Sequence, residues 1–192
     1  MSTSKVVAEH LVRSGAYLTG EFLLKDGTVQ PDFVDVGRIT GRNLYFLAEL
    51  ITRELYSFRP LDVIVAPPYK AIPLAATVSA LADLPFDFYR KEVKAYGEQG
   101  LWVTKAISAS HLVLVIDDVL TSGITKREVL YHIWTAGAIP IGILAIVDRT
   151  DGEIRTIDGV PTYSLTTLSE ICSVYKSKSG EARQFSHLVQ LF

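Results

Sequence analysis

The sequence predicts an α/β protein with a central parallel sheet flanked by helices. Three observations carry this prediction: apolar runs rich in β-branched residues, helical patterns between those runs, and polar side chains directly after them. Continuous apolar runs, as opposed to alternating ones, are typical of strands that are covered on both faces. With 192 residues and 48% hydrophobic residues, the chain is long enough for one domain with a sizeable core.

Five segments are predicted as strands. The three strongest are "DVIVA" (62–66), "LVLVI" (112–116) and "IGILAIV" (141–147). Two shorter segments, "FDFY" (86–89) and "PTYSL" (161–165), have the same β-branched or aromatic character. The chain contains no repeats, low-complexity tracts or linker-like stretches, so no domain boundary is expected.

Helical spacing separates the predicted strands. One helix precedes the first strand and has an apolar face made of Leu44, Leu47, Leu50, Ile51 and Leu55. A second covers "IPLAATVSALA" (72–82), and a third, ending at Gly137, places these residues on one face: Val129, Leu130, Ile133 and Trp134. Alternation of strands and helices implies right-handed crossovers, and in such sheets ligands bind beyond the carboxyl ends of the strands.

Composition excludes several classes of protein. The 19 basic and 21 acidic residues give a net charge of −2, which argues against a nucleic-acid binder that works by bulk charge. Cys172 is the single cysteine, so neither an intrachain disulfide nor a multi-cysteine zinc site is expected. The first residues lack the apolar block of a signal peptide, and the longest apolar run is about half of a membrane span. We therefore expect a cytoplasmic protein without membrane or nucleic-acid partners.

The segment 117–125, "DDVLTSGIT", has the character of a sugar-phosphate site. Gly123 permits a tight turn, and backbone N–H groups, hydroxyl groups and a helix N-terminus together form a phosphate cradle. The carboxylates of Asp117 and Asp118 accept hydrogen bonds from ribose hydroxyl groups or face a magnesium ion. The alternative is an ordinary strand-to-helix loop with acidic capping residues. The segment lacks the glycine patterns of P-loops and dinucleotide folds.

This segment resembles the phosphoribosyl pyrophosphate (PRPP) motif of type I phosphoribosyltransferases. The resemblance implies that PRPP contacts the following residues: Tyr69, Lys70, Arg90, Lys91, Lys94, Asp117, Asp118, Val119, Leu120, Thr121, Ser122, Gly123, Ile124 and Thr125. It also implies the type I phosphoribosyltransferase fold, in which a small hood formed largely by the N-terminal segment covers the site. For this chain it predicts a single domain, 1–192, with the hood at about 1–40 and the core at about 41–192.

Three further segments resemble orotate phosphoribosyltransferases. They are "LTGEFLLKDGTVQPDFVD" (18–35), "APPYKAIPLA" (66–75) and "YRKEVKAYGEQG" (89–100), the last resembling the mobile catalytic loop of that family. The family converts orotate and PRPP to orotidine 5′-phosphate and pyrophosphate, in pyrimidine biosynthesis. The resemblance implies Mg²⁺ as cofactor, bound mainly through PRPP without direct protein ligands, and a homodimer with shared active sites.

The same resemblance assigns roles to individual residues. Lys94, Asp117 and Asp118 match catalytic positions, and Arg90, Lys91 and Lys94 match cations that stabilise the departing pyrophosphate. The orotate site is expected to comprise Lys25, Phe33, Thr121 and Arg149. A planar guanidinium such as that of Arg149 suits a carboxylate or a pyrimidine carbonyl edge.

The chain departs from the family at several positions. Tyr96 replaces a loop histidine, Gln99 replaces a glycine, Ile124 stands where relatives carry a hydroxyl group, and Gln30 and Asp32 replace serine and an aromatic residue. Two alternatives therefore stay open: a phosphoribosyltransferase for another base, and a PRPP-binding regulator without catalysis. The retained cations of the 90–94 segment favour an enzyme, because sensing alone does not require them.

Overall fold

The computed structural model describes residues 2–23, 27–91 and 101–189 of the chain. Its main sheet has six strands in the order β4-β3-β5-β6-β8-β7. Their bounds are β3 (Val63–Ala66), β4 (Phe86–Phe88), β5 (Leu112–Leu120), β6 (Ile139–Asp148), β7 (Thr156–Ile157) and β8 (Val160–Thr167). Neighbouring strands from β4 to β8 are parallel, and only β7 pairs antiparallel. The predicted α/β sheet is confirmed.

Strand β5 is longer than the sequence analysis predicted. It continues past Ile116 to Leu120, so Asp117 and Asp118 lie inside the strand and not after it. Both ends of this extension pair with β6, Asp117 opposite Ala145 and Leu120 opposite Asp148. The strand continues through the two acids because the backbone ladder with β6, and not the apolar character of the residues, determines where the strand ends.

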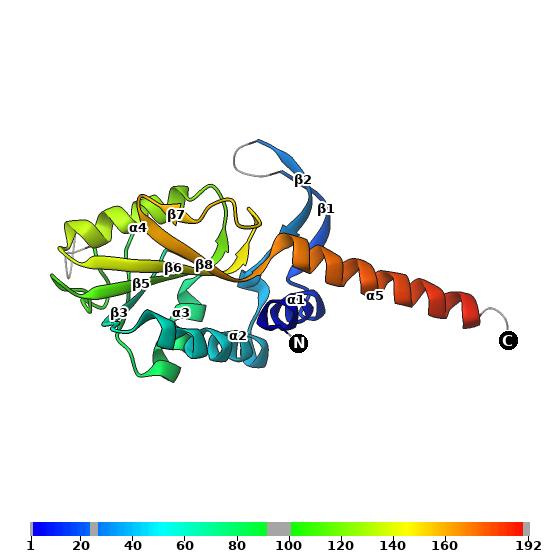
Figure 1. The fold of residues 1–192 in the computed structure, drawn as a ribbon, viewed down its shortest axis with the longest axis horizontal. Helices are drawn as coiled ribbons and strands as arrows, with labels where there is room; N and C mark the ends of the chain where they lie inside the picture. The colour runs from blue at the N-terminus through cyan, green and yellow to red at the C-terminus, as the bar shows by residue number, and fades with distance from the viewer. Residues whose placement is uncertain (1, 24–26, 92–100, 190–192) are drawn as a thin grey trace.

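The three predicted helices are confirmed as α2 (Gly41–Glu54), α3 (Ile72–Ala82) and α4 (Ile124–Thr135). Helices α2 and α3 cover one face of the sheet and α4 covers the other (Figure 1). Alternate strand residues therefore enter different apolar clusters, Leu114 on the α2–α3 side and Val115 on the α4 side. Burial on both faces explains why the strands are continuous apolar runs.

The two ends of the chain contain elements that the sequence analysis did not predict. Helix α1 (Thr3–Arg13) and a two-stranded antiparallel sheet, β1 (Tyr17–Leu23) with β2 (Val29–Val34), precede the core. Short 3₁₀ turns follow as η1 (Val36–Arg38) and η2 (Leu55–Phe58), and the chain ends in α5 (Leu168–Val189). The β1–β2 hairpin stands apart from the main sheet, next to the start of α5 (Figure 1). Such a hairpin suits the predicted hood.

Candidate active site

The carboxyl ends of β3, β5 and β6 lie side by side, and eight of the 17 predicted site residues follow them. The order β3-β5-β6 places the segments after these strands at one edge of the sheet. The N–H group of Arg149 donates a hydrogen bond to the carbonyl oxygen of Leu120 at 3.0 Å. This bond joins the ends of β5 and β6 and places Arg149 beside the 121–125 turn.

The 121–125 turn connects β5 to the N-terminus of α4. Gly123 precedes the first residue of the helix with a φ of 82°, a left-handed conformation that favours glycine. A Cβ atom there would lie 2.9 Å from Cδ1 of Ile157, so the position also lacks room for a side chain. Thr121 and Ser122 are exposed. Since the first N–H groups of a helix have no partner within the helix, the turn has the geometry of an anion cradle.

The two acids of β5 differ in their environment. Asp117 has only 6% of its side chain exposed, and its Oδ1 accepts a hydrogen bond from the N–H of Asp118 at 2.8 Å. Asp118 is less buried, and its Oδ1 accepts from the N–H of Val119 at 2.8 Å. Burial, and then the neighbouring Asp117 carboxylate, raise the pKa of Asp118 to about 7, against a lowering by Lys126. A carboxyl group with this pKa has a proton affinity suited to exchange near neutral pH.

A buried lysine beneath the acids was missed by the sequence analysis. The ammonium group of Lys126 lies 2.5 Å from Oδ2 of Asp117 and 2.5 Å from the carbonyl oxygen of Val119. A signal for its burial was present. Lys126 stands three, four and seven residues before Val129, Leu130 and Ile133, which places it on the apolar face of the third predicted helix.

Cations and aromatic rings from β3, β4 and the hood lie close together. Lys70, after β3, forms an ion pair of 2.8 Å with Asp35, and its ammonium lies 5.5 Å from the ring centroid of Phe33 in β2. Lys91, after β4, lies 5.7 Å from the ring centroid of Tyr69. Four predicted site residues thus form two pairs within cation–π distance: Lys70 with Phe33, and Lys91 with Tyr69.

The predicted catalytic loop is described only at its base. The N–H group of Arg90 donates to the carbonyl oxygen of Leu101 at 3.0 Å, which closes this base. Lys25, Lys94 and Tyr96 lie outside the described residues. Their predicted roles stay predictions.

A second buried acid fixes the segment that follows the loop. Asp87, at the centre of β4, is fully buried, and its two carboxylate oxygens accept hydrogen bonds from five backbone N–H groups: those of Phe88, Val103, Thr104, Ala106 and Ile107. The sequence analysis missed this role. An acid in the middle of the strand segment "FDFY" was the available signal, because a buried carboxylate requires several donors.

At the other end of the site, Arg149 pairs with a hood residue. One guanidinium nitrogen lies 3.5 Å from Oδ1 of Asp32, and the two side chains are 11% and 13% exposed. Oδ1 of Asp32 has no hydrogen-bond partner, and its Oδ2 has a long contact of 3.9 Å with Sγ of Cys172. The neighbouring Phe33 stacks on Phe22 with ring centroids 5.6 Å apart. The unusual acid at position 32 is therefore directed to the predicted orotate-binding arginine.

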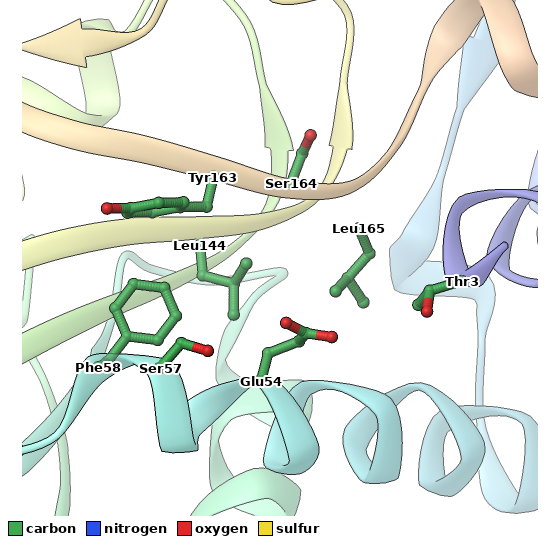
Figure 2. Close-up of a pocket in the computed structure, with 8 residues that line it drawn as sticks. All are labelled: Thr3, Glu54, Ser57, Phe58, Leu144, Tyr163, Ser164 and Leu165. Carbon is green, nitrogen blue, oxygen red and sulfur yellow. The ribbon is translucent and has the colours of Figure 1, made fainter.

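One cavity lies away from these residues. It has a volume of about 350 Å³ and lies between the end of α2 and the middle of β6 and β8, with Glu54, Phe58, Leu144 and Tyr163 in its wall (Figure 2). None of the predicted site residues lines it. In the described part of the chain, no helix is long and apolar enough to cross a membrane.

Residues 2–23, 27–91 and 101–189 do not form a metal site by themselves. They contain no group of three or more His, Cys, Asp or Glu side chains arranged to hold a metal ion. Near the acid pair, the Lys126 ammonium already occupies one side of Asp117.

Comparisons with known proteins agree with this geometry. Residues 41–172 match the family model of the phosphoribosyl transferase domain. The orotate phosphoribosyltransferase of Chromohalobacter salexigens is 35% identical, over 90% of this chain and 82% of its own. That of Saccharophagus degradans is 37% identical, over 91% and 89%. The chain belongs to the orotate phosphoribosyltransferase family.

Solved structures of the orotate phosphoribosyltransferase family confirm the fold. The enzyme of Francisella tularensis superposes with a TM-score of 0.70 at 27% identity, over 90% of each chain. The UMP synthase of Leishmania donovani gives a TM-score of 0.77 at 25% identity. The match covers 92% of this chain but 39% of that longer protein. The predicted type I phosphoribosyltransferase fold and the class of glycosyl-transferring enzyme are both confirmed.

Proposed function

We propose that this protein transfers the phosphoribosyl group of PRPP to N1 of orotate, releasing pyrophosphate and forming orotidine 5′-phosphate for pyrimidine biosynthesis. The observation that carries the proposal is the hydrogen bond between Arg149 and Leu120. It holds a guanidinium suited to a carboxylate beside a turn suited to a phosphate. Orotate and PRPP carry these two groups.

Each group of PRPP is assigned to protein residues, beginning with the phosphate at the 121–125 turn. The 5′-phosphate binds the N–H and hydroxyl groups of 121–125, and the ribose hydroxyl groups donate to the acids of β5. Pyrophosphate is held by the side chains of these residues: Tyr69, Lys70, Arg90, Lys91 and Lys94. As the bond between C1′ and the pyrophosphate oxygen breaks, negative charge grows on pyrophosphate, and fixed cations stabilise that state more than the ground state.

Magnesium and the base complete the proposal. Mg²⁺, carried by PRPP, would neutralise part of the pyrophosphate charge. Orotate would lie between Phe33 and the backbone near Thr121, with Arg149 and Lys25 directed to its polar edge. The bond from C1′ to N1 of orotate forms as the bond from C1′ to the pyrophosphate oxygen breaks, and the N1 proton is released to solvent.

Turnover of single bases tests this function. Purified protein, PRPP and Mg²⁺ are combined with orotate, uracil, cytosine, adenine or hypoxanthine, and pyrophosphate release is followed. We expect release with orotate and background rates with the other bases. A protein that binds PRPP but releases pyrophosphate with none of the bases is a regulator, and preference for another base removes orotate from the proposal.

One observation favours the second candidate, a transferase for another base. The Asp32 carboxylate lies 3.5 Å from the guanidinium of Arg149 and offsets part of its charge. A base without a carboxylate would depend less on that charge. The base panel separates the two candidates directly.

We further propose that the chain is a single cytoplasmic domain that forms a homodimer, in which each 89–100 loop closes over the PRPP site of its partner. Lys94→Ala damages only the donated loop, and Asp118→Ala damages only the receiving site. Each variant alone should be nearly inactive. After subunit exchange, random pairing makes about half of the dimers heterodimers with one intact site, so about a quarter of wild-type activity returns. A mixture that stays inactive after confirmed exchange excludes the shared site.

A further inference from the structure

Lys126 occupies a position that is unfavourable for a lysine. It is 4% exposed, on the apolar face of α4, and it is the third residue of that helix. A positive charge in the first turn opposes the helix dipole, which favours anions there. Burial of an ammonium group is also unfavourable unless the group is paired and hydrogen-bonded. A specific set of partners must therefore hold it in place.

Those partners belong to the phosphoribosyl motif. The ammonium of Lys126 contacts Oδ2 of Asp117 and the carbonyl oxygen of Val119, each at 2.5 Å. The other oxygen of Asp117 accepts the N–H group of Asp118 at 2.8 Å. Both carboxylate oxygens of Asp117 are thus engaged inside the protein, and its side chain is 6% exposed.

Charge gives this arrangement a consequence for the ligand. The carboxylates of Asp117 and Asp118 lie in β5, separated by two residues from the turn that has the geometry of an anion cradle. Two negative charges at that place repel an anionic ligand, and in a buried site water screens the repulsion weakly. The ammonium of Lys126 cancels one of them. Asp118, the less buried acid, is left to face the ligand.

We propose that Lys126 is a positioning residue of the phosphoribosyl site, which holds Asp117 inward and offsets its charge so that Asp118 alone meets the ribose. The inference rests on the proposed function, since it takes PRPP as the ligand of the turn. It assigns different roles to two neighbouring acids: Asp117 is an internal partner of Lys126, and Asp118 contacts the substrate.

Three variants test this assignment. Lys126→Met keeps the side-chain length and removes the charge. Lys126→Met/Asp117→Asn removes both partners and restores the formal net charge of the wild-type cluster formed by Asp117, Asp118 and Lys126. Lys176→Met, on the exposed side of α5, is the control for the loss of one positive charge. PRPP affinity is measured by calorimetry with and without Mg²⁺, the KM for orotate by turnover, and stability by thermal unfolding.

We expect Lys126→Met to weaken PRPP binding roughly tenfold, the effect of one poorly screened charge near an anion. The KM for orotate should not change. The double variant should recover most of the PRPP affinity, and Lys176→Met should bind as the wild type does. A merely structural lysine would lower the melting temperature in Lys126→Met and leave PRPP affinity unchanged, and that result would overturn the proposal.

If Lys126→Met does not fold, the double variant decides, because it buries no unpaired charge. Near-native PRPP affinity in that variant supports the proposal that Asp117 pairs with Lys126 inside the protein and does not contact PRPP. Loss of PRPP binding would mean that the ligand needs the Asp117 carboxylate, and the proposal fails. PRPP affinity does not depend on the base, so a failure of the orotate assignment would appear separately, as missing turnover by the wild type.

Discussion

The phosphoribosyl end and the base end of the site are built in opposite ways. At the phosphoribosyl end, nine consecutive residues, 117–125, supply the acids and the turn, and a buried ion pair between Lys126 and Asp117 fixes them. At the base end, Phe33 and Asp32 come from the hood, and Arg149 comes from the end of β6. Their ion pair of 3.5 Å is longer, and Oδ1 of Asp32 has no hydrogen bond.

This difference indicates which end is rigid and which can change. A contiguous segment on a central strand keeps its geometry whatever the hood does. A site that joins the hood to the core depends on how the two pack, and one substitution such as that at position 32 alters its charge. We therefore expect PRPP binding to tolerate few changes in the turn, and base preference to respond to single charges.

The largest effect is expected at Gly123. In Gly123→Ala the added methyl group meets Cδ1 of Ile157 at 2.9 Å and the residue must keep a strained φ of 82°, so either the buried Ile157 side chain or the turn has to shift. PRPP binding by calorimetry should be lost, while circular dichroism remains that of the wild type. Gly159→Ala is a matched control, since Gly159 has a φ of 84° and no atom within 4 Å of the added Cβ. Native PRPP affinity in Gly123→Ala would show that the turn does not hold the phosphate.

Arg149→Ala should affect the base end selectively. Loss of a charge-assisted contact costs about 2–3 kcal/mol, so orotate should bind roughly 30- to 150-fold more weakly while PRPP affinity changes little. Because the truncation also leaves the Asp32 carboxylate unpaired, Arg149→Ala/Asp32→Asn serves as the control for that second effect. Equal losses for orotate and PRPP in the double variant would contradict an assignment of Arg149 to the base.

Asp118→Asn should change the pH dependence of stability. The pKa of Asp118 is raised in the folded protein from 3.8 to about 7. A raised carboxyl pKa contributes stability that is present below the ordinary pKa and is lost as pH rises through the folded value. At about pH 8 the melting temperature of the variant should therefore exceed that of the wild type, by about 2–4 °C for each kcal/mol gained in the free energy of unfolding. At about pH 4 the variant should show no such gain. A pH-independent difference would mean that the carboxyl pKa is not raised.

The smallest effect is expected for Asp32→Asn. Removal of the carboxylate frees the charge of Arg149 for the ligand, so the KM for orotate should fall by roughly two- to fivefold, the effect of a unit charge about 5–10 Å away when water in the open site screens it. PRPP affinity should stay unchanged, because Asp32 lies at the other end of the site. An increased KM for orotate would indicate that Asp32 instead holds Arg149 in its productive orientation.

The same contrast explains what the sequence could predict. The parallel sheet, α2 to α4 and the 117–125 turn follow from local apolar runs and from residue types at fixed spacing. Helix α5 was missed because its serines, lysines and single glycine dilute the apolar stripe. The β1–β2 hairpin was missed because several of its strand residues are exposed or half-buried, so its pattern is weak.

Contacts between distant segments could not be predicted from the sequence. The pairs Arg149–Asp32 and Lys70–Asp35 join residues far apart in the chain, and no local pattern encodes them. Lys126 is different. Its burial follows from helical spacing with Val129 and Ile133, but that spacing does not indicate that Asp117 is its partner.

A competition between bases tests most directly whether one end of the site binds PRPP and the other selects orotate. Limiting PRPP and Mg²⁺ are offered with equal amounts of orotate, uracil and adenine, and the nucleotide products are separated and quantified. The product ratio equals the ratio of kcat/KM values for the competing bases. We predict orotidine 5′-phosphate as the dominant product in the wild type, and a loss of this preference in Arg149→Ala. A uridine or adenosine nucleotide as the main product of the wild type would contradict the assignment of the base end to orotate.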